Sequence, residues 1–330
     1  MIFSILDLLY LDIFLILVGQ NIFILSITNK ILSKAFKNAK SVNINKYSKI
    51  IFFSDLHRGD NSYADDFKHN MLIHEHALTD YYKKEYTYIE IGDGIELWEN
   101  KTFAPIYMAH KKSFELLKLF QEKKRLFLLW GNHDMEFRDP IFVEKLRNKY
   151  FLPKNIAAKN ILFNLKYYES LLLKIEELDK NIFILHGHQA DYMNYRHWKF
   201  NRFFVRYFWK YMQKWFGISD PTSPAKNYSG LIKVEKKLNK WIVKNNNQMI
   251  ICGHTHRPRF PDPGDIPHFN DGSCVHPNSI IGIEIVDLHI SLIKWHEYQN
   301  QNTGKKEIKK VNLEGPVHLE RFLKGHLLDL

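Results

Sequence analysis

The sequence predicts an α/β protein whose buried strands end in reactive side chains. From Ile50 onward, short apolar stretches alternate with amphipathic helical stretches, as in layered α/β folds. Five apolar stretches end at a residue that can bind metal or transfer a proton. They cover residues 50–55, 86–91, 125–130, 181–185 and 248–252. In open α/β sheets, ligands bind beyond the carboxyl ends of the strands. We therefore expect these residues to converge on one sheet edge.

Helices and further strands follow the same alternation. Helices are expected at His69–Lys84, Ile106–Lys123 and Pro140–Tyr150, whereas Ile161–Leu178 shows no clear pattern. Three C-terminal stretches alternate as strands do, and we expect them to form a second sheet. These stretches are His268–Cys274, Ser279–Val286 and His289–Trp295.

Composition bounds the classes of protein that the chain can be. A chain of 330 residues with 45% hydrophobic and 25% charged residues is ordinary for a globular protein, which excludes pervasive disorder. The net charge of +11 favours an anionic partner: nucleic acid, a phospholipid surface or a phosphorylated substrate. The two cysteines, Cys252 and Cys274, are too few for a disulfide framework or a thiolate metal site. A reducing, cytoplasmic setting is therefore expected, with Cys252 as a packing residue.

We divide the chain into residues 1–46, a hydrophobic and then basic helical segment, residues 47–300, the main domain, and residues 301–330, a C-terminal tail. The apolar run Ile13–Ile27 is shorter than the roughly 20 residues of a membrane span. No lysine or arginine precedes Lys30, so the basic region of a signal peptide is absent. The lysines that follow share one face of a predicted helix: Lys30, Lys34, Lys37 and Lys40. Two interpretations stay open: membrane contact of residues 1–28, as a marginal span or as a peripheral interfacial helix, or a helix packed on the domain.

An insertion is predicted at about residues 192–245, between the strand before His186 and the strand before His254. Its first half interleaves Arg and Lys with Trp, Phe and Tyr, and its second half is a lysine-rich helix. We expect a helical cap over the site, with cations meeting phosphates and aromatic rings meeting acyl chains or bases. The alternative is a helical hairpin packed by its aromatic residues, with its lysines in solvent.

The strand ends offer oxygen and imidazole ligands without thiolates. They supply Asp55, His57, Asp93, the triplet Asn132-His133-Asp134, His186, His254 and His256. Such ligands suit Mn²⁺, Fe or Zn²⁺ in a reactive centre. Seven candidate ligands from this set are too many for one ion, but a carboxylate shared by two ions about 3.5 to 4 Å apart resolves the count.

The five motifs, taken in order, resemble the calcineurin-like metallophosphoesterases over about residues 50–290. They are Ser54-Asp55-Leu56-His57, Gly92-Asp93-Gly94, Gly131-Asn132-His133-Asp134, His186 and Gly253-His254-Thr255-His256. Any one of them alone is more often turn chemistry than a ligand set, but five such turns in this order are jointly improbable. The resemblance implies a four-layer α/β/β/α sandwich that binds two divalent metals, with Mn expected and Fe or Zn as alternatives.

The resemblance also implies a role for each residue. Asp55, His57 and His256 would hold the first metal, Asn132, His186 and His254 the second, and Asp93 would bridge them. His133 would face the substrate as general acid or phosphate stabiliser, with Asp134 orienting its imidazole. Glu96 and Trp98 are expected to support their loop, and His188 either to bind substrate or to hydrogen-bond a ligand.

The expected function is hydrolysis of a phosphate or pyrophosphate ester, nucleotide- or lipid-linked, by attack of a metal-bound hydroxide. The insertion is similar in placement and composition to that of the bacterial branch that includes UDP-2,3-diacylglucosamine diphosphatase. The chain departs from that branch at His133, where the branch has arginine, and at His188, where it has an acidic residue. Alternatives are a metal-dependent nuclease, whose aromatic residues would stack bases, a protein phosphatase of the same fold, and a non-catalytic interaction module. No expected ligand is missing, which argues against the last; the oligomeric state stays open.

Overall fold

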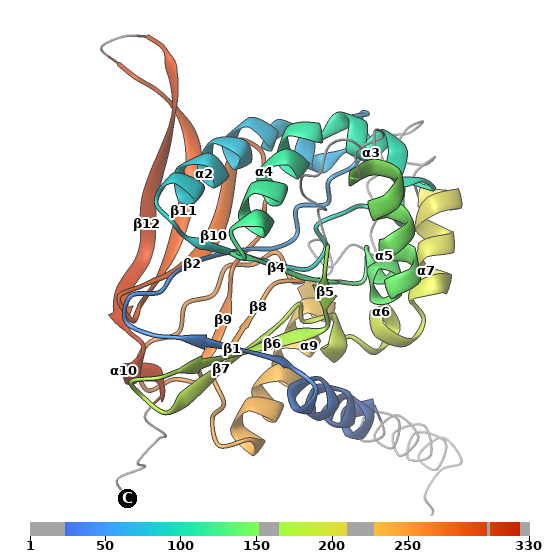
Figure 1. Cartoon of the computed structure of the whole chain (residues 1–330). Coiled ribbons are helices and arrows are strands. Elements are labelled where there is room, and N and C mark those ends of the chain that lie inside the picture. The colour runs from blue at the N-terminus through green and yellow to red at the C-terminus, as the bar shows by residue number, and fades with distance from the viewer. Residues whose placement is uncertain (1–23, 152–164, 210–227, 302–303, 324–330) are drawn as a thin grey trace, which may run out of the picture.

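Two β-sheets packed face to face form the centre of the computed structural model, which describes residues 24–151, 165–209, 228–301 and 304–323 (Figure 1). The seven-stranded sheet has the order β12-β11-β10-β2-β3-β4-β5, and the five-stranded sheet has the order β1-β6-β7-β8-β9. The larger sheet comprises β12 (Lys306–His318), β11 (His289–Gln299), β10 (Ser279–Val286), β2 (Lys49–Phe53), β3 (Thr87–Ile91), β4 (Leu126–Leu129) and β5 (Tyr167–Tyr168). The smaller comprises β1 (Lys40–Ile44), β6 (Ser170–Ile175), β7 (Lys180–Leu185), β8 (Ile250–Cys252) and β9 (His268–Asn270).

The central strands are apolar throughout because both of their faces are buried. In β2, Ile51 and Phe53 point to the core beneath the outer helices, and Ile50 and Phe52 point to the core between the sheets. The parallel pairing of β2, β3 and β4 brings their carboxyl ends to the same edge.

Helices cover the outer face of each sheet, as Figure 1 shows. Helices α2 (Met71–Lys83) and α4 (Lys111–Glu122) pack on the larger sheet. The helix of residues 24–37 and α9 (Tyr228–Lys244) pack on the smaller one. The four layers are therefore α/β/β/α, which confirms the predicted fold.

Shorter elements connect these layers. They are η1 (Asp66–His69), α3 (Phe103–Ala109), η2 (Met135–Arg138), α5 (Pro140–Leu146), η3 (Arg147–Phe151), η4 (His188–Ala190), α6 (Tyr192–Arg196), α7 (Trp198–Phe204), η5 (Val205–Trp209) and α10 (Glu320–Leu323).

The allocation of strands to sheets differs from the prediction. The five strands that carry the site residues do not share one sheet: β2, β3 and β4 lie in the larger sheet, and β7 and β8 in the smaller. The later strands also divide, since β9 joins β8 whereas β10 and β11 extend the larger sheet beyond β2. Strand periodicity records burial but not pairing partner, so the sequence could not make this distinction.

Two predicted helices are shorter than expected. The stretch Ile106–Lys123 is interrupted at His110, whose buried ring lies with Nε2 3.2 Å from Oδ2 of Asp65. The stretch Pro140–Tyr150 is α-helical only to Leu146 and then widens into the π-helical turn η3.

The second half of the insertion does not cap the site. Helix α9 buries Leu238, Trp241 and Ile242 against Phe183 and Ile250 of the smaller sheet. Its apolar residues recur at helical spacing, so it forms part of the outer layer. Only α6, α7 and η5 stand over the site end of the sheets, and residues 210–227 of the insertion lie outside the described residues.

The N-terminal helix packs on the domain through Leu32 and Ala35, which are buried against Phe183 and Trp241. Its lysines Lys30, Lys34 and Lys37 are exposed, but Lys40 begins β1 instead of continuing the helix. Residues 1–23 lie outside the described residues. Within the described part of the chain, no helix is long and apolar enough to cross a membrane.

The segment 301–330, expected to be a tail, contributes an edge strand. Strand β12 pairs with β11 along most of its length. Its residues are exposed or half-buried, and three are lysine, so the apolar alternation that marks a core strand is missing.

A buried ion pair lies beneath the site loops. Nη1 and Nη2 of Arg58 lie 3.0 and 2.8 Å from the two carboxylate oxygens of Glu90, and Nη1 also donates to the carbonyl oxygen of Gly94 at 3.1 Å. Arg58 is fully buried and Glu90 nearly so. The pair joins the loop after β2 to the end of β3.

Glu90→Gln should leave the Arg58 charge buried without its partner. We expect the free energy of unfolding to fall by about 3 to 5 kcal/mol. Chemical denaturation in the presence of a chelator measures this without a contribution from bound metal. The control is Asp80→Asn, which removes the exposed ion pair with Lys84 and should cost less than about 1 kcal/mol. Equal, small losses in both variants would contradict a structural role for the buried pair.

Candidate metal centre

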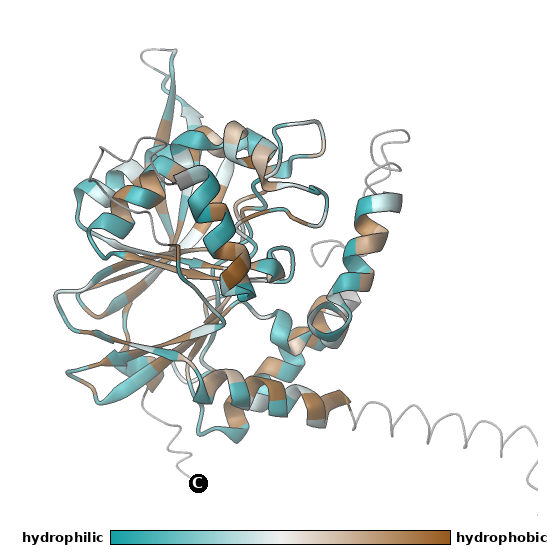
Figure 2. Cartoon of the chain, turned by 45° about the vertical axis from the view of Figure 1, so that its right-hand side comes forward, coloured by the Kyte–Doolittle hydropathy of each residue, from teal (hydrophilic) through white to brown (hydrophobic). Residues whose placement is uncertain are grey.

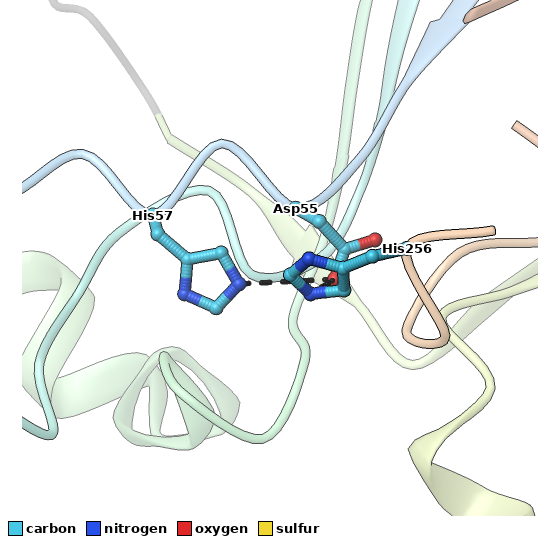
Figure 3. A group of neighbouring side chains, drawn as sticks. All are labelled: Asp55, His57 and His256. Carbon is cyan, nitrogen blue, oxygen red and sulfur yellow. Dashed lines mark ion pairs between the residues drawn. The ribbon is translucent and has the colours of Figure 1, made fainter. Parts of the chain in front are cut away.

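The predicted site residues lie in the loops that follow β2, β3 and β4 of the larger sheet and β7 and β8 of the smaller one. These loops come together at one end of the two sheets. In the first group, Nε2 of His256 lies 3.1 Å and Nε2 of His57 3.8 Å from Oδ1 of Asp55 (Figure 3). The potential ligand atoms of these three residues all lie within 4.8 Å of one another.

A second group lies beside the first. It contains Asp93, His186 and His254, again with ligand atoms within 4.8 Å of one another, and Nε2 of His186 is 3.2 Å from Oδ2 of Asp93. Asp93 also forms a group with His57 and His133. Asp93 therefore lies between the two sides of the site, where a shared carboxylate would have to be.

Five of these residues adopt a left-handed backbone conformation, which is uncommon for residues other than glycine. They are Asp55 (φ 50°), His57 (φ 49°), Asp93 (φ 49°), His254 (φ 69°) and His256 (φ 55°). Such conformations cost free energy and gather at functional sites, where the surrounding structure holds them. These five left-handed residues are therefore evidence for a functional site that does not depend on their chemical type.

Hydrogen bonds fix how two of the imidazoles face the centre. Nδ1 of His186 lies 2.7 Å from the carbonyl oxygen of Ile91, and Nδ1 of His57 lies 2.8 Å from Oε2 of Glu96. A carbonyl oxygen and a carboxylate accept these N–H groups, so each Nε2 is left with its lone pair toward the centre. This is the arrangement in which proteins present histidine to a metal.

Buried polar atoms without a hydrogen-bond partner in the described residues cluster here. They include Oδ1 of Asp55, Nε2 of His57, both side-chain polar atoms of Asn132, Nε2 of His186, and both ring nitrogens of His254. Buried polar groups are normally paired, so an unpaired cluster of nitrogen and oxygen donors fits a bound cation. The donor set therefore fits a divalent metal centre.

The electrostatics of the site point the same way. Burial alone would raise the pKa of Asp55 and Asp93, but the neighbouring histidines, His256 and His186 first, hold both pKa values well below their usual range. Burial would lower the pKa of His186, but Asp93 and Asp55 raise it to about 9. The carboxylates are thus ionised at neutral pH and need compensating positive charge, from protonated imidazoles or from cations.

Glycines let the loops approach the carboxylates closely. A Cβ on Gly131 would lie 2.1 Å from Oδ1 of Asp93, and a Cβ on Gly253 would lie 2.6 Å from Oδ2 of Asp55. Any side chain at these two positions would displace a candidate ligand, which explains why the motifs contain glycine there.

His133 is oriented by Glu96, not by Asp134 as expected. Nδ1 of His133 lies 2.8 Å from Oε2 of Glu96, the same oxygen that contacts His57, and its ring stacks on Trp98 with centroids 4.2 Å apart. Asp134 instead accepts backbone N–H groups of Gly131, Gly94 and Ile95. Burial and nearby Asp93 raise the pKa of Asp134 to about 7. Its carboxylate ties two site loops together.

The sequence analysis missed three further contributors. Asp191 places Oδ2 3.6 Å from Nε2 of His254, Ser54 places Oγ within hydrogen-bond distance of Asp55, and Asp271 lies 2.7 Å from the same hydroxyl. Ser54 stands in the first motif, next to Asp55, whereas no motif or periodicity marks Asp191 or Asp271. These two reach the centre through tertiary contacts, and Asp271 lies 217 positions along the chain from Ser54.

The cap touches the site loop that carries Glu96. Arg206 donates to the carbonyl oxygen of Trp98 at 3.1 Å and to that of Leu97, and Arg202 pairs with Glu136. The inner side of α7 and η5 is thereby fastened to the loop that positions His57 and His133.

Glu96→Gln should weaken the hold on both imidazoles, because the amide cannot accept from both as a carboxylate does. We expect metal affinity or turnover to fall by about 10- to 100-fold, with the fold unchanged. Metal titration and circular dichroism measure the two quantities, and Glu99→Gln in the same loop is the control. An unchanged affinity and turnover in Glu96→Gln would contradict the positioning role.

Comparisons with known proteins place the chain in a family. Solved structures similar to the chain include Vacuolar Protein Sorting 29 from Cryptosporidium parvum, with 13% identity, a TM-score of 0.36, and coverage of 81% of this chain and 98% of that one. Vps29 from Entamoeba histolytica complexed with Zn²⁺ has 14% identity, a TM-score of 0.35, and coverage of 81% and 99%. No curated protein matches the chain. Residues 48–258 match the family described as calcineurin-like phosphoesterase, and the chain belongs to that family.

Proposed function

We propose that the protein is a metal-dependent phosphoesterase that uses two divalent ions, manganese foremost, to hydrolyse a phosphate or pyrophosphate ester. The observation that carries the proposal is the pair of ligand groups on either side of Asp93. Asp55, His57 and His256 would hold one ion, Asn132, His186 and His254 the other, and Asp93 both. Bound ions of this kind activate water and neutralise charge that develops on a phosphoryl oxygen.

His133 is the residue best placed to handle the leaving group. Glu96 holds its Nδ1 and Trp98 supports its ring, so Nε2 is the atom left to give a proton to the departing oxygen or to bind the phosphate. The backbone N–H of His133 donates to Oδ1 of Asp93 at 2.8 Å, which fixes the loop relative to the centre. Asp134 supports the loop, because its carboxylate accepts hydrogen bonds from backbone N–H groups of two loops.

A cavity beside the cap favours a substrate that is larger than a simple phosphate. It has a volume of about 530 Å³ and is lined by Arg138, Tyr195, Arg196, His197, Trp198, Lys199 and Phe200. Tyr195 connects it to the site, because its ring lies 5.7 Å from that of His188, which lies 5.3 Å from that of His186. Cations with aromatic rings suit a phosphorylated group joined to a nucleoside or an acyl chain. This supports a nucleotide- or lipid-linked ester, as in the diphosphatase branch.

The same cavity supports a second candidate, a nuclease, because aromatic rings beside cations can stack bases and bind phosphates. A nuclease would cleave single-stranded nucleic acid in a reaction that requires metal and weakens as the salt concentration rises.

The first experiment is hydrolysis of a matched set of substrates with Mn²⁺: p-nitrophenyl phosphate, its bis ester, a UDP-sugar, a UDP-acyl-sugar and a single-stranded oligonucleotide. Cleavage confined to the pyrophosphates supports the nucleotide- or lipid-linked ester, and preference for the simple esters overturns that part. Cleavage of the oligonucleotide favours the nuclease. No metal-dependent cleavage of any of them would contradict the proposal.

Asp93→Asn should lose both metals and most of the activity, because the bridging residue loses its charge. Metal content after gel filtration and activity toward the preferred substrate measure the two effects. The surface variant Asp80→Asn should keep both, and full metal content in Asp93→Asn would exclude a bridging role.

His133→Ala should keep its metals but turn over more slowly, on the order of 100-fold or more. The same two measurements separate binding from turnover. Loss of metal from His133→Ala would mean that the imidazole is a ligand and not a proton donor.

A further inference from the structure

The helix formed by α7 and η5 turns four aromatic rings to the exterior and two arginines inward, beside the buried Val205. Its cations Arg202 and Arg206 face inward, to Glu136 and to the carbonyl oxygens of Leu97 and Trp98. Its outward side carries four large rings that are 59%, 58%, 43% and 54% exposed, in the order Phe200, Phe203, Phe204 and Tyr207. A helix on a protein in water normally turns its apolar side inward, so this arrangement needs an explanation.

The four rings form one surface, which we call the aromatic stripe. They stand at positions i, i+3, i+4 and i+7, which share one helix face. The rings of Phe200 and Phe204 are 4.8 Å apart, and those of Phe203 and Tyr207 are 5.0 Å apart. Figure 2 shows this helix standing at the side of the molecule, away from both sheets.

The exposed charges described beside the stripe are positive. Between Asp191 and Asp220 the sequence has no acidic residue and six basic ones, of which two face inward and two lie outside the described residues. Arg196 and Lys199 are exposed beside the stripe. Apolar rings flanked by cations are the composition of surfaces that lie in the headgroup region of anionic membranes.

The N-terminal helix lies near the same side of the molecule. In both views the helix of residues 24–37 begins on the side where α7 lies (Figures 1 and 2). It carries three exposed lysines, Lys30, Lys34 and Lys37.

We propose that the aromatic stripe docks on an anionic phospholipid surface. Three of its rings are phenylalanine, without a polar atom, and the rings contact one another in tilted pairs instead of standing parallel and apart to receive bases. The arginines nearest to it on the helix, which would be needed for a nucleic-acid backbone, face inward. The inference goes beyond the proposed hydrolysis and does not depend on it. It also gives the cap a role: the docked helix is the one fastened to the loop that carries Glu96.

A probe on the stripe tests the inference in the full chain. Both native cysteines are buried, so Phe203→Cys offers a single accessible thiol for a polarity-sensitive fluorophore. The labelled protein is mixed with phosphatidylcholine vesicles and with vesicles of phosphatidylcholine and phosphatidylglycerol. We expect a blue shift with the mixed vesicles and at least about tenfold weaker binding after Phe204→Ser with Tyr207→Ser, which leave the cavity lining intact. Leu72→Cys, at a residue 61% exposed on α2, is the matched control and should show no shift.

Each other outcome overturns the inference. Vesicle binding without a blue shift at Phe203→Cys would mean that another segment carries the contact. A shift produced by single-stranded DNA without vesicles would make the stripe a base-stacking surface. A shift that depends on protein concentration alone would make it a contact between two copies of the chain. None of these readouts uses hydrolysis, so a failure here is distinct from a failure of the proposed function.

Discussion

Buried negative charge is the constraint on which the rest of the structure depends. Asp55 and Asp93 lie almost without solvent where the ends of the two sheets meet, and both are held ionised by the histidines around them. Ionised carboxylates are costly to bury without compensation, so the site must supply imidazolium or cations. The hydrogen bonds that turn the Nε2 atoms of His57 and His186 inward make the centre ready for cations. The strained backbone and the glycine contacts follow from gathering so many donors into so small a volume.

A framework outside the ligands holds this arrangement. The Arg58–Glu90 pair joins the loop after β2 to the end of β3, and Asp134 gathers backbone N–H groups from two loops. Glu96 connects the two sides of the site, since one oxygen contacts both His57 and His133. The positions of the candidate ligands are therefore set by the buried side chains of Arg58, Glu90, Glu96 and Asp134 around them.

The cap connects this framework to the molecular surface. The inward arginines of α7 and η5 fasten it to the loop of Glu96, and its outward rings meet the surroundings. One helix thus has a side that belongs to the site and a side that belongs to the exterior. On this helix Arg202 and Arg206 serve the inner side, whereas the four rings of the aromatic stripe serve the outer side.

The sequence by itself determined the layered fold and the gathering of the candidate residues, because motif order and strand-end position are local properties. Apolar runs fix strands, and residues placed just after parallel strands emerge at the same end. The division of the strands between two sheets, the break at His110 and the packing of α9 were decided only by tertiary structure, since periodicity records that a face is buried but not what covers it. Glu96 illustrates the same limit in the site. Nothing in its neighbourhood along the chain distinguishes it from Glu99, and only the approach of two loops places its carboxylate between two imidazoles.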